Sequence, residues 1–180
     1  MHATPAHHTL SWKNVLITGP PGIGKTTVIK ELTQRLRPYH PAGFYTREIR
    51  EGGVRKGFEL VDLDGRKRVL SHMGIKSSHR IGKYGVDIPG FERFLGNIPF
   101  FASDRRSIVI DEIGKMECLS PMFINMLTKL LESDRPVVAS IALKGGGTIE
   151  TVKLRSDVHL FHMHRSNRDM IINDILKYFS

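Results

Sequence analysis

The feature that most constrains this chain is a glycine-rich loop between two segments of different periodicity. The loop, GPPGIGKT at residues 19–26, follows a short apolar run with β-branched residues, NVLIT at residues 14–18. That run is typical of a buried strand. After the loop, four apolar residues recur at helical spacing until Pro38, namely Val28, Ile29, Leu32 and Leu36. An ordinary turn needs one or two glycines, so this loop must meet a stronger demand on the backbone.

The loop matches the pattern G-x-x-x-x-G-K-[ST], the phosphate-binding loop or P-loop. In such a loop, consecutive backbone N–H groups surround an anionic phosphate chain, and Gly22 and Gly24 leave room for it. Lys25 is placed to reach the β- and γ-phosphates, and the Thr26 hydroxyl is placed to coordinate Mg²⁺. The helix that we expect to begin at Lys25 directs its positive end at the phosphates. The predicted nucleotide-binding residues of the loop are Gly19, Pro20, Pro21, Gly22, Ile23, Gly24, Lys25, Thr26 and Thr27.

A second predicted strand, SIVIDE at residues 107–112, ends in two carboxylates. A P-loop site takes an acid from the end of a neighbouring parallel strand to hold the metal, and Asp111 is in that position. Glu112 follows it and can take a proton from a water molecule aimed at the γ-phosphate. The alternative is that Glu112 only caps a helix or is solvated. Lys115, which follows Gly114, either touches phosphate or is solvated.

The rest of the chain alternates between strand and helix patterns. Further strands are expected over residues 136–143 and 157–163. Helices are expected within residues 87–104, with a break near Gly96 and Pro99, from Pro121 after the N-cap Ser120, over residues 148–154, and from about Asn167 to Phe179. A hairpin block, residues 43–73, turns at Gly52-Gly53 and Asp64-Gly65 and is expected to be antiparallel. The predicted fold class is therefore α/β: a three-layer sandwich with a mostly parallel sheet, helices on both faces, and an antiparallel hairpin extension.

The composition is that of one globular domain. The chain has 180 residues, 40% of them hydrophobic and 25% charged, which suffices for a core without disulfides or metals. We assign residues 13–180 to a single domain and residues 1–12 to a flexible extension. The single cysteine, Cys118, excludes an intramolecular disulfide, and no apolar run is long enough to span a membrane. We expect a cytoplasmic monomer with no membrane partner, and the net charge of +9 leaves nucleic acid open as a partner.

Several segments together resemble the small nucleoside-triphosphatase family that includes the thermophilic NTPases and the animal cancer-related nucleoside-triphosphatase. They span nearly the whole chain from Val15 and are GPPGIGKTT (residues 19–27), GFYTREIREGGVRKGFELV (43–61), IGKYGVDIPGFE (81–92), IVIDEIGKME (108–117) and NRD (167–169). The resemblance implies a P-loop NTPase fold of the nucleotide-kinase type. It also implies slow, Mg²⁺-dependent hydrolysis of ATP, GTP and other nucleoside triphosphates to diphosphate and phosphate, with broad base tolerance.

The resemblance also assigns roles by position. It assigns the phosphates to residues 19–26, the metal to Asp111 and the role of base to Glu112, and it places residues 108–115 along the nucleotide and Asn167 and Arg168 at the base or the phosphates. From the loop itself we also predict that Lys25 is catalytic and that Thr26 binds Mg²⁺. One segment departs from the family pattern. Where the family has a shorter connection after the VVASIA strand, this chain has LKGGG at residues 143–147, and the role of that loop stays open.

The sequence does not choose the cation that stabilises charge on the γ-phosphoryl group in the transition state. The candidates are Lys83, Arg155, Arg165 and Arg168. The segment around Lys83 and Tyr84 either forms a mobile cover over the nucleotide or places Tyr84 in the core.

Two other functions stay open on the sequence alone. One is a nucleotide or small-molecule kinase of the same fold, which the absence of an arginine-rich lid and the presence of Glu112 disfavour. The other is a nucleic-acid-associated nucleotide switch, supported only by the basic charge.

Overall fold

A computed structural model describes residues 13–178, so the predicted extension over residues 1–12 lies outside the described residues, as does Phe179. Nine strands of the described part form one sheet in the order β5-β6-β4-β3-β2-β7-β8-β1-β9. The strands are β1 (Asn14–Thr18), β2 (Pro41–Glu51), β3 (Val54–Asp62), β4 (Lys67–His72), β5 (Arg80–Ile81), β6 (Tyr84–Val86), β7 (Ser107–Ile113), β8 (Val137–Ile141) and β9 (Val158–His162). The α-helices are α1 (Lys25–Arg35), α2 (Ile88–Gly96), α3 (Pro121–Glu132), α4 (Thr148–Lys153) and α5 (Ile171–Leu176).

Five strands make up the parallel half of the sheet. β1 lies between β8 and β9 and is parallel to both, and β7 is parallel to β8. Residues 41–45 of β2 extend this half by pairing in parallel with β7. The carboxyl ends of these strands therefore meet at one edge of the sheet, the edge where open α/β sheets bind ligands.

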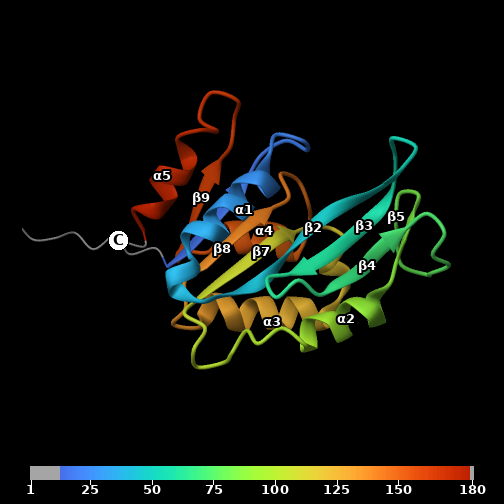
Figure 1. Cartoon of the computed structure of the whole chain (residues 1–180), viewed down its shortest axis with the longest axis horizontal. Helices are drawn as coiled ribbons and strands as arrows, with labels where there is room; N and C mark the ends of the chain where they lie inside the picture. The colour runs from blue at the N-terminus through green and yellow to red at the C-terminus, as the bar shows by residue number, and fades with distance from the viewer. Residues whose placement is uncertain (1–12, 179–180) are drawn as a thin grey trace, which may run out of the picture.

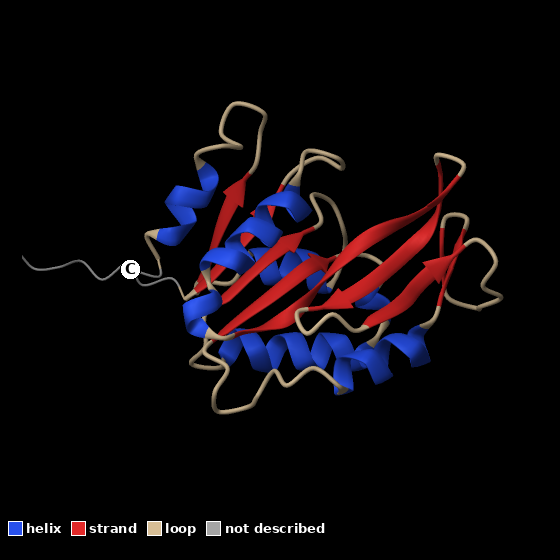
Figure 2. Ribbon diagram, viewed as in Figure 1, coloured by secondary structure: helices blue, strands red, loops and turns tan. Residues whose placement is uncertain are grey.

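Alternate side chains of the parallel strands enter two separate cores. Val15 and Ile17 pack with the apolar face of α1 and with α5, whereas Leu16 packs on the other side with α2, α3 and α4. Figure 1 shows α1 and α5 above the sheet and α2 and α3 below it. This arrangement of a sheet between two helical layers confirms the predicted fold class, and Figure 2 shows how the strands extend beyond the helices on one side.

The extension on that side is an antiparallel arm built on β2. From Phe44 to Glu51, β2 pairs with β3, and β3 pairs in turn with β4. The prediction that the block over residues 43–73 is antiparallel and extends the sheet is confirmed by the β2–β3 and β3–β4 pairs, and residues 41–45 also pair in parallel with β7. One long strand thus belongs to both halves of the sheet. Its pairing with β7 ends opposite Asp111, so its remaining residues project past the carboxyl edge.

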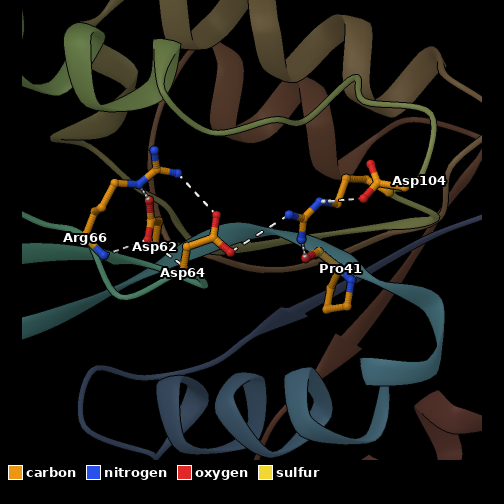
Figure 3. A network of polar contacts seen from close by, with 6 residues as sticks. Pro41, Asp62, Asp64, Arg66 and Asp104 are labelled. Atoms are coloured by element: carbon orange, nitrogen blue, oxygen red, sulfur yellow. Dashed lines mark hydrogen bonds and ion pairs between the residues drawn. The ribbon is translucent and has the colours of Figure 1, made fainter.

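A cluster of charged residues fixes the opposite end of the arm. The Arg66 guanidinium donates to Asp62 at 2.6 Å, and Asp64 lies between Arg66 and Arg105 (Figure 3). Arg105 also donates to the carbonyl oxygen of Pro41, the first residue of β2, at 3.3 Å. These contacts tie the β3–β4 turn to the amino end of β2, away from the P-loop, so we assign them a structural role.

Most element boundaries follow the sequence pattern, and two do not. The turns at Gly52-Gly53 and Gly65 have positive φ angles, and the Ser120 hydroxyl caps α3, as predicted. The predicted start of the last helix is wrong: α5 begins at Ile171 rather than near Asn167, because the segment before it forms a turn. The short strands β5 and β6 were not expected, because two or three residues carry no measurable alternation.

Candidate functional site

The P-loop connects β1 to α1 at the carboxyl edge of the parallel strands. Gly22 and Gly24 have φ angles of 75° and 109°, which residues with side chains rarely adopt. The Lys25 ammonium folds back over the loop and donates hydrogen bonds to the carbonyl oxygens of Gly19 at 3.0 Å and Pro20 at 3.4 Å. Because α1 begins at Lys25, its unpaired N–H groups face the space that the loop surrounds.

Asp111 and Thr26 come from the end of β7 and the first turn of α1, and they are in direct contact. The Thr26 hydroxyl donates to one carboxylate oxygen of Asp111 at 2.7 Å, and the Ser140 hydroxyl on β8 donates to the other. Asp111 is 1% exposed. Burial raises the pKa of its carboxyl group, while the hydrogen bonds from Ser140 and Thr26 oppose the rise and favour the charged form.

Glu112 is joined to Asp111 by a cis peptide bond, and its half-buried side chain lines the same hollow as Lys25 and Thr26. Among residues 13–178, no side chain forms a hydrogen bond or an ion pair with the Glu112 carboxylate. Burial raises the pKa of Glu112, and Asp111 adds to the rise while Lys25 opposes it. A carboxylate that lacks a protein donor and has a raised pKa is suited to accept a proton.

A second acid, Glu117, lies behind Glu112 and was not among the residues predicted from sequence. It is only 5% exposed. Burial, with a further contribution from the nearby Glu112, raises the pKa of Glu117 to about 8. Gly114 lies between the two acids: a Cβ atom there would be 2.7 Å from Glu117 Oε2 and 3.6 Å from Glu112 Cγ. A glycine at position 114 is therefore what lets the two carboxyl groups approach each other.

Replacement of Glu117 by Gln is expected to stabilise the protein by an amount that grows with pH. A carboxyl group with a raised pKa holds its proton more tightly in the folded state, so the free energy of unfolding falls from about pH 4.5 to about pH 8. Glutamine cannot ionise, so the variant lacks this fall, and the difference grows by up to about 1.4 kcal/mol per pH unit. Urea unfolding of both proteins across this window measures it, and a pH-independent difference would contradict the assignment.

The P-loop lies between two hollows. The first, about 780 Å³, is lined by Pro20, Pro21, Gly22, Ile23, Met163, His164, Arg165, Arg168 and Asp169. The second, about 450 Å³, is lined by Pro21, Gly22, Gly24, Lys25, Thr26, Lys30, Thr46, Arg47, Glu48, Arg55, Phe58 and Glu112. Of these two hollows, only the second is lined by Glu112 and by the arm residues Arg47 and Arg55.

Arg168 and Asn167 lie beside the loop but do different things. The Arg168 guanidinium packs against Gly24, with its Cζ atom 3.3 Å from the position a Cβ would take. Asn167 accepts a hydrogen bond from the His164 N–H at 2.7 Å and donates one to the His162 carbonyl at 2.8 Å. Asn167 therefore holds the turn that carries Arg168 toward the loop. Its predicted contact with the nucleotide stays a prediction.

The four cations considered from sequence are scattered. Arg165 and Arg168 line the first hollow, whereas Arg155 pairs with Asp157 at 2.8 Å and Lys83 lies over the Tyr84 ring. Tyr84 itself is buried and packs against Phe58, with ring centroids 5.6 Å apart. This geometry favours the core position for Tyr84 over a cover. Lys115 is exposed at the rim of a third hollow next to Glu112.

Several residues at the site were missed because the sequence gives little sign of them. Arg47 reaches the second hollow because β2 runs past the carboxyl edge, and Arg55 reaches it because β3 pairs with that part of β2. Both positions follow from strand pairing rather than from the sequence pattern. Ser140 carried a usable signal. It is the only polar residue of the apolar strand β8, and a polar residue in such a strand implies a buried partner.

Asp111 and Thr26 fit a magnesium site. Mg²⁺ prefers hard oxygen ligands and is usually held by one or two protein groups together with phosphate oxygens and water. A buried carboxylate and a hydroxyl in contact beneath a phosphate-binding loop supply that donor set. Within residues 13–178 no cluster of three or more His, Cys, Asp or Glu side chains could hold a metal ion. None of the helices in the same range qualifies as a membrane span by its length and hydropathy.

Comparison with protein families gives one clear match. A family model described as NTPase matches residues 14–176. Among curated proteins, the chain is 40% identical over 163 residues to the nucleoside-triphosphatase THEP1 of Thermotoga sp. (strain RQ2), covering 90% of this chain and 92% of that protein. It is 36% identical over 180 residues to the human cancer-related nucleoside-triphosphatase, covering 91% and 95% of the two chains.

Solved structures agree with this match. The chain is similar to the crystal structure of THEP1 from the hyperthermophile Aquifex aeolicus, with a TM-score of 0.78 and 30% identity over 91% of this chain and 97% of that one. It is also similar to the solution structure of a human cancer-related nucleoside triphosphatase, with a TM-score of 0.77 and 34% identity over 93% and 97% of the two chains. The likeness therefore includes both the P-loop half and the antiparallel arm.

Proposed function

Since the chain belongs to the NTPase family and is a nucleoside-triphosphatase, we propose that it hydrolyses ATP, GTP and other nucleoside triphosphates to diphosphate and phosphate, with Mg²⁺ as cofactor. The observation that carries the proposal is the contact of Thr26 with the buried Asp111, which places Glu112 beside the P-loop. In this proposal the residues that bind phosphate, hold the metal and activate water all lie at one edge of the sheet.

Phosphate binding is the task of the loop and Lys25. Backbone N–H groups of residues 22–26 and the amino end of α1 supply donors and partial positive charge to the phosphate oxygens. The Lys25 ammonium, which lies over the loop beside the Gly19 and Pro20 carbonyls, binds the β- and γ-phosphates in this proposal. Thr26 and Asp111 would hold Mg²⁺, which when bound supplies positive charge to the phosphate oxygens.

Water activation is the task of Glu112. Its carboxylate shares a hollow with Lys25 and has no protein donor among the described residues, so it is free to accept a hydrogen bond from a water molecule next to the γ-phosphate. Its raised pKa brings its basicity closer to neutral pH, where proton transfer is efficient. The proton leaves the water as its oxygen bonds to phosphorus, and the nucleoside diphosphate departs.

The arm supplies the additional positive charge in this proposal. Arg47 and Arg55 line the hollow that contains Lys25 and Glu112, whereas Arg165 and Arg168 lie in the hollow on the other side of the loop. Arg47 pairs with Glu59 at 2.5 Å and Arg55 with Glu48 at 2.8 Å. Both arginines are partly exposed, so a bound triphosphate can attract either one from its acidic partner.

The base occupies the first hollow in this proposal. Its lining offers His164 and two arginines, planar groups that stack on any base, and few buried donors or acceptors that would read base edges. This lining supports broad base tolerance. Arg168 lies where the first hollow meets Gly24 of the loop, within reach of a base or a phosphate.

Replacement of Arg168 by Ala is expected to weaken binding of every nucleotide by about tenfold, because one charge-assisted contact is worth about 1.5 kcal/mol or more. Arg155→Ala is the matched control, because Arg155 pairs with Asp157 and lines neither of the two hollows beside the P-loop. Calorimetric titration with nonhydrolysable ATP and GTP analogues measures both variants. Equal affinities for Arg168→Ala and the native chain would remove Arg168 from the site.

The proposed function is tested by phosphate release from ATP, GTP, CTP and UTP. We expect release from all four with Mg²⁺, its loss when EDTA is in excess, and no change when single- or double-stranded nucleic acid is added. Release from one nucleotide alone would contradict base tolerance. Release that required nucleic acid would favour the nucleotide switch instead.

A further inference from the structure

A third hollow, about 560 Å³, opens from the catalytic side of the loop between the P-loop sheet edge and the arm. It shares Pro21, Lys25, Thr46, Phe58 and Glu112 with the γ-phosphate side of the site. Its other lining residues are Gly19, Ile81, Gly114, Lys115, Met116, Glu117, Ala142, Leu143 and Lys144. The hollow therefore adjoins the position that the reacting phosphate takes in the proposed function.

The size and walls of this hollow exceed what hydrolysis needs. A water nucleophile occupies one small position beside the γ-phosphate, whereas sites for small organic ligands measure about 300–1,000 Å³. The walls are largely apolar, formed by Phe58 from the arm, Met116 from the segment after β7, and Leu143 from the segment after β8. An apolar wall gives no benefit to water, but it favours a hydrocarbon surface.

The polar groups of the hollow are concentrated around Glu112 and Glu117. Glu117 is 5% exposed, yet it lines the hollow, and its carboxyl group lies beside Gly114 rather than against a basic side chain. Glu112 interacts electrostatically with both Lys25 and Glu117. A molecule in the hollow would thus meet an apolar surface along its body and two carboxyl groups where it approaches the phosphate.

We propose that this hollow binds a small organic alcohol with an apolar ring or chain, and that its hydroxyl group accepts the γ-phosphoryl group in place of water. The proposal rests on the proposed function, because it uses the same phosphate loop and the same Glu112. The apolar body packs against Phe58, Met116 and Leu143, and the carboxyl groups of Glu112 and Glu117 face its hydroxyl end. Hydrolysis is then the reaction of the same site when no alcohol is present.

The transfer balances without a further reactant. The hydroxyl oxygen of the alcohol bonds to the γ-phosphorus, the bond from that phosphorus to the β–γ bridging oxygen breaks, and the nucleoside diphosphate leaves with the electron pair. The hydroxyl proton passes to Glu112 and then to solvent. The products are a phosphate monoester and a nucleoside diphosphate.

A nucleoside monophosphate fits the hollow less well as the acceptor. Its phosphate group would need cations of its own, most effectively a bidentate arginine. The described lining residues of this hollow include no arginine, and Lys115 and Lys144 are exposed at the surface rather than set beside the acids. Lys25 is already committed to the triphosphate.

The test measures phosphoryl transfer from MgATP to benzyl alcohol, phenethyl alcohol and cyclohexylmethanol, with AMP as a further acceptor, by phosphorus NMR. We expect a phosphate monoester of at least one alcohol alongside free phosphate. Leu143→Trp, at a side chain 38% exposed, fills the hollow and is expected to lower the ratio of monoester to free phosphate at least about tenfold. Leu154→Trp is the matched control, 84% exposed and outside the hollow, and is expected to leave this ratio unchanged.

The other outcomes overturn the proposal in distinguishable ways. Phosphate release without any monoester would refute the acceptor site and leave the hydrolase intact. Consumption of AMP to form ADP, without any phosphate monoester of an alcohol, would identify the acceptor as a nucleoside monophosphate rather than an alcohol. An equal ratio in the two tryptophan variants would place the acceptor outside this hollow. If neither phosphate release nor phosphoryl transfer is observed, the proposed function itself is refuted.

Discussion

Replacement of Glu112 by Gln is expected to lower hydrolysis by about a hundredfold to ten-thousandfold, the usual contribution of a general base, while nucleotide affinity stays close to that of the native chain. Glutamine has nearly the size and shape of glutamate, so the hollow keeps its form. It cannot accept a proton at neutral pH, so the water molecule loses its base. The loss should therefore appear in kcat, with little change in the affinity for a nonhydrolysable analogue.

The structure simplifies the interpretation of this experiment. Because no described side chain binds the Glu112 carboxylate, the variant breaks no ion pair, and a fall in activity cannot be attributed to one. Glu132→Gln, an exposed acid at the end of α3, is a control for the loss of one negative charge. Single-turnover hydrolysis of ATP and GTP measures the chemical step. A turnover of Glu112→Gln within about twofold of the native rate would exclude general-base catalysis by this residue.

The fold was largely predictable because local sequence signals mark most of the strands and helices that the structure contains. The apolar strands β1, β7 and β8 are bounded by glycine, proline and charged residues, and the Ser120 cap with Pro121 marks the start of α3. Each of these signals acts over a few residues, so the sequence contains them directly. The start of α5 was misplaced for the complementary reason: the Asn167 side chain bonds to the His162 carbonyl and the His164 N–H, and no local pattern encodes those contacts.

The candidate site was predictable only where one motif encodes it. The loop, Asp111 and Glu112 are recognisable from spacing, whereas the roles of Arg47 and Glu117 depend on elements meeting in space. Arg47 reaches the second hollow because β2 pairs with β7 and then continues past the edge. Glu117 lies beside Glu112 because Gly114 has no side chain to separate them. Neither fact can be obtained from periodicity, which describes faces of elements and not the distances between them.

Replacement of Lys25 by Ala is expected to weaken triphosphate binding by about tenfold to a hundredfold and to lower hydrolysis by a further factor of about a hundred. Lys25 donates hydrogen bonds to the Gly19 and Pro20 carbonyls at 3.0 and 3.4 Å, and it contacts the β- and γ-phosphates in the proposed complex. The loss of affinity should therefore be large for a nonhydrolysable triphosphate, smaller for a diphosphate and smallest for a monophosphate.

This gradient separates a phosphate contact from a general disordering of the loop. Lys25→Met retains much of the apolar stem and should show the same gradient as Lys25→Ala, because the charge is what both variants lack. Lys129→Ala, at an exposed position on α3, should show no change. Calorimetric titration with the three phosphate classes provides the comparison. If Lys25→Ala weakened all three classes equally, Lys25 would act on the shape of the loop alone, and the β- and γ-phosphates would need another cation, for which Arg47 and Arg55 lie in the same hollow.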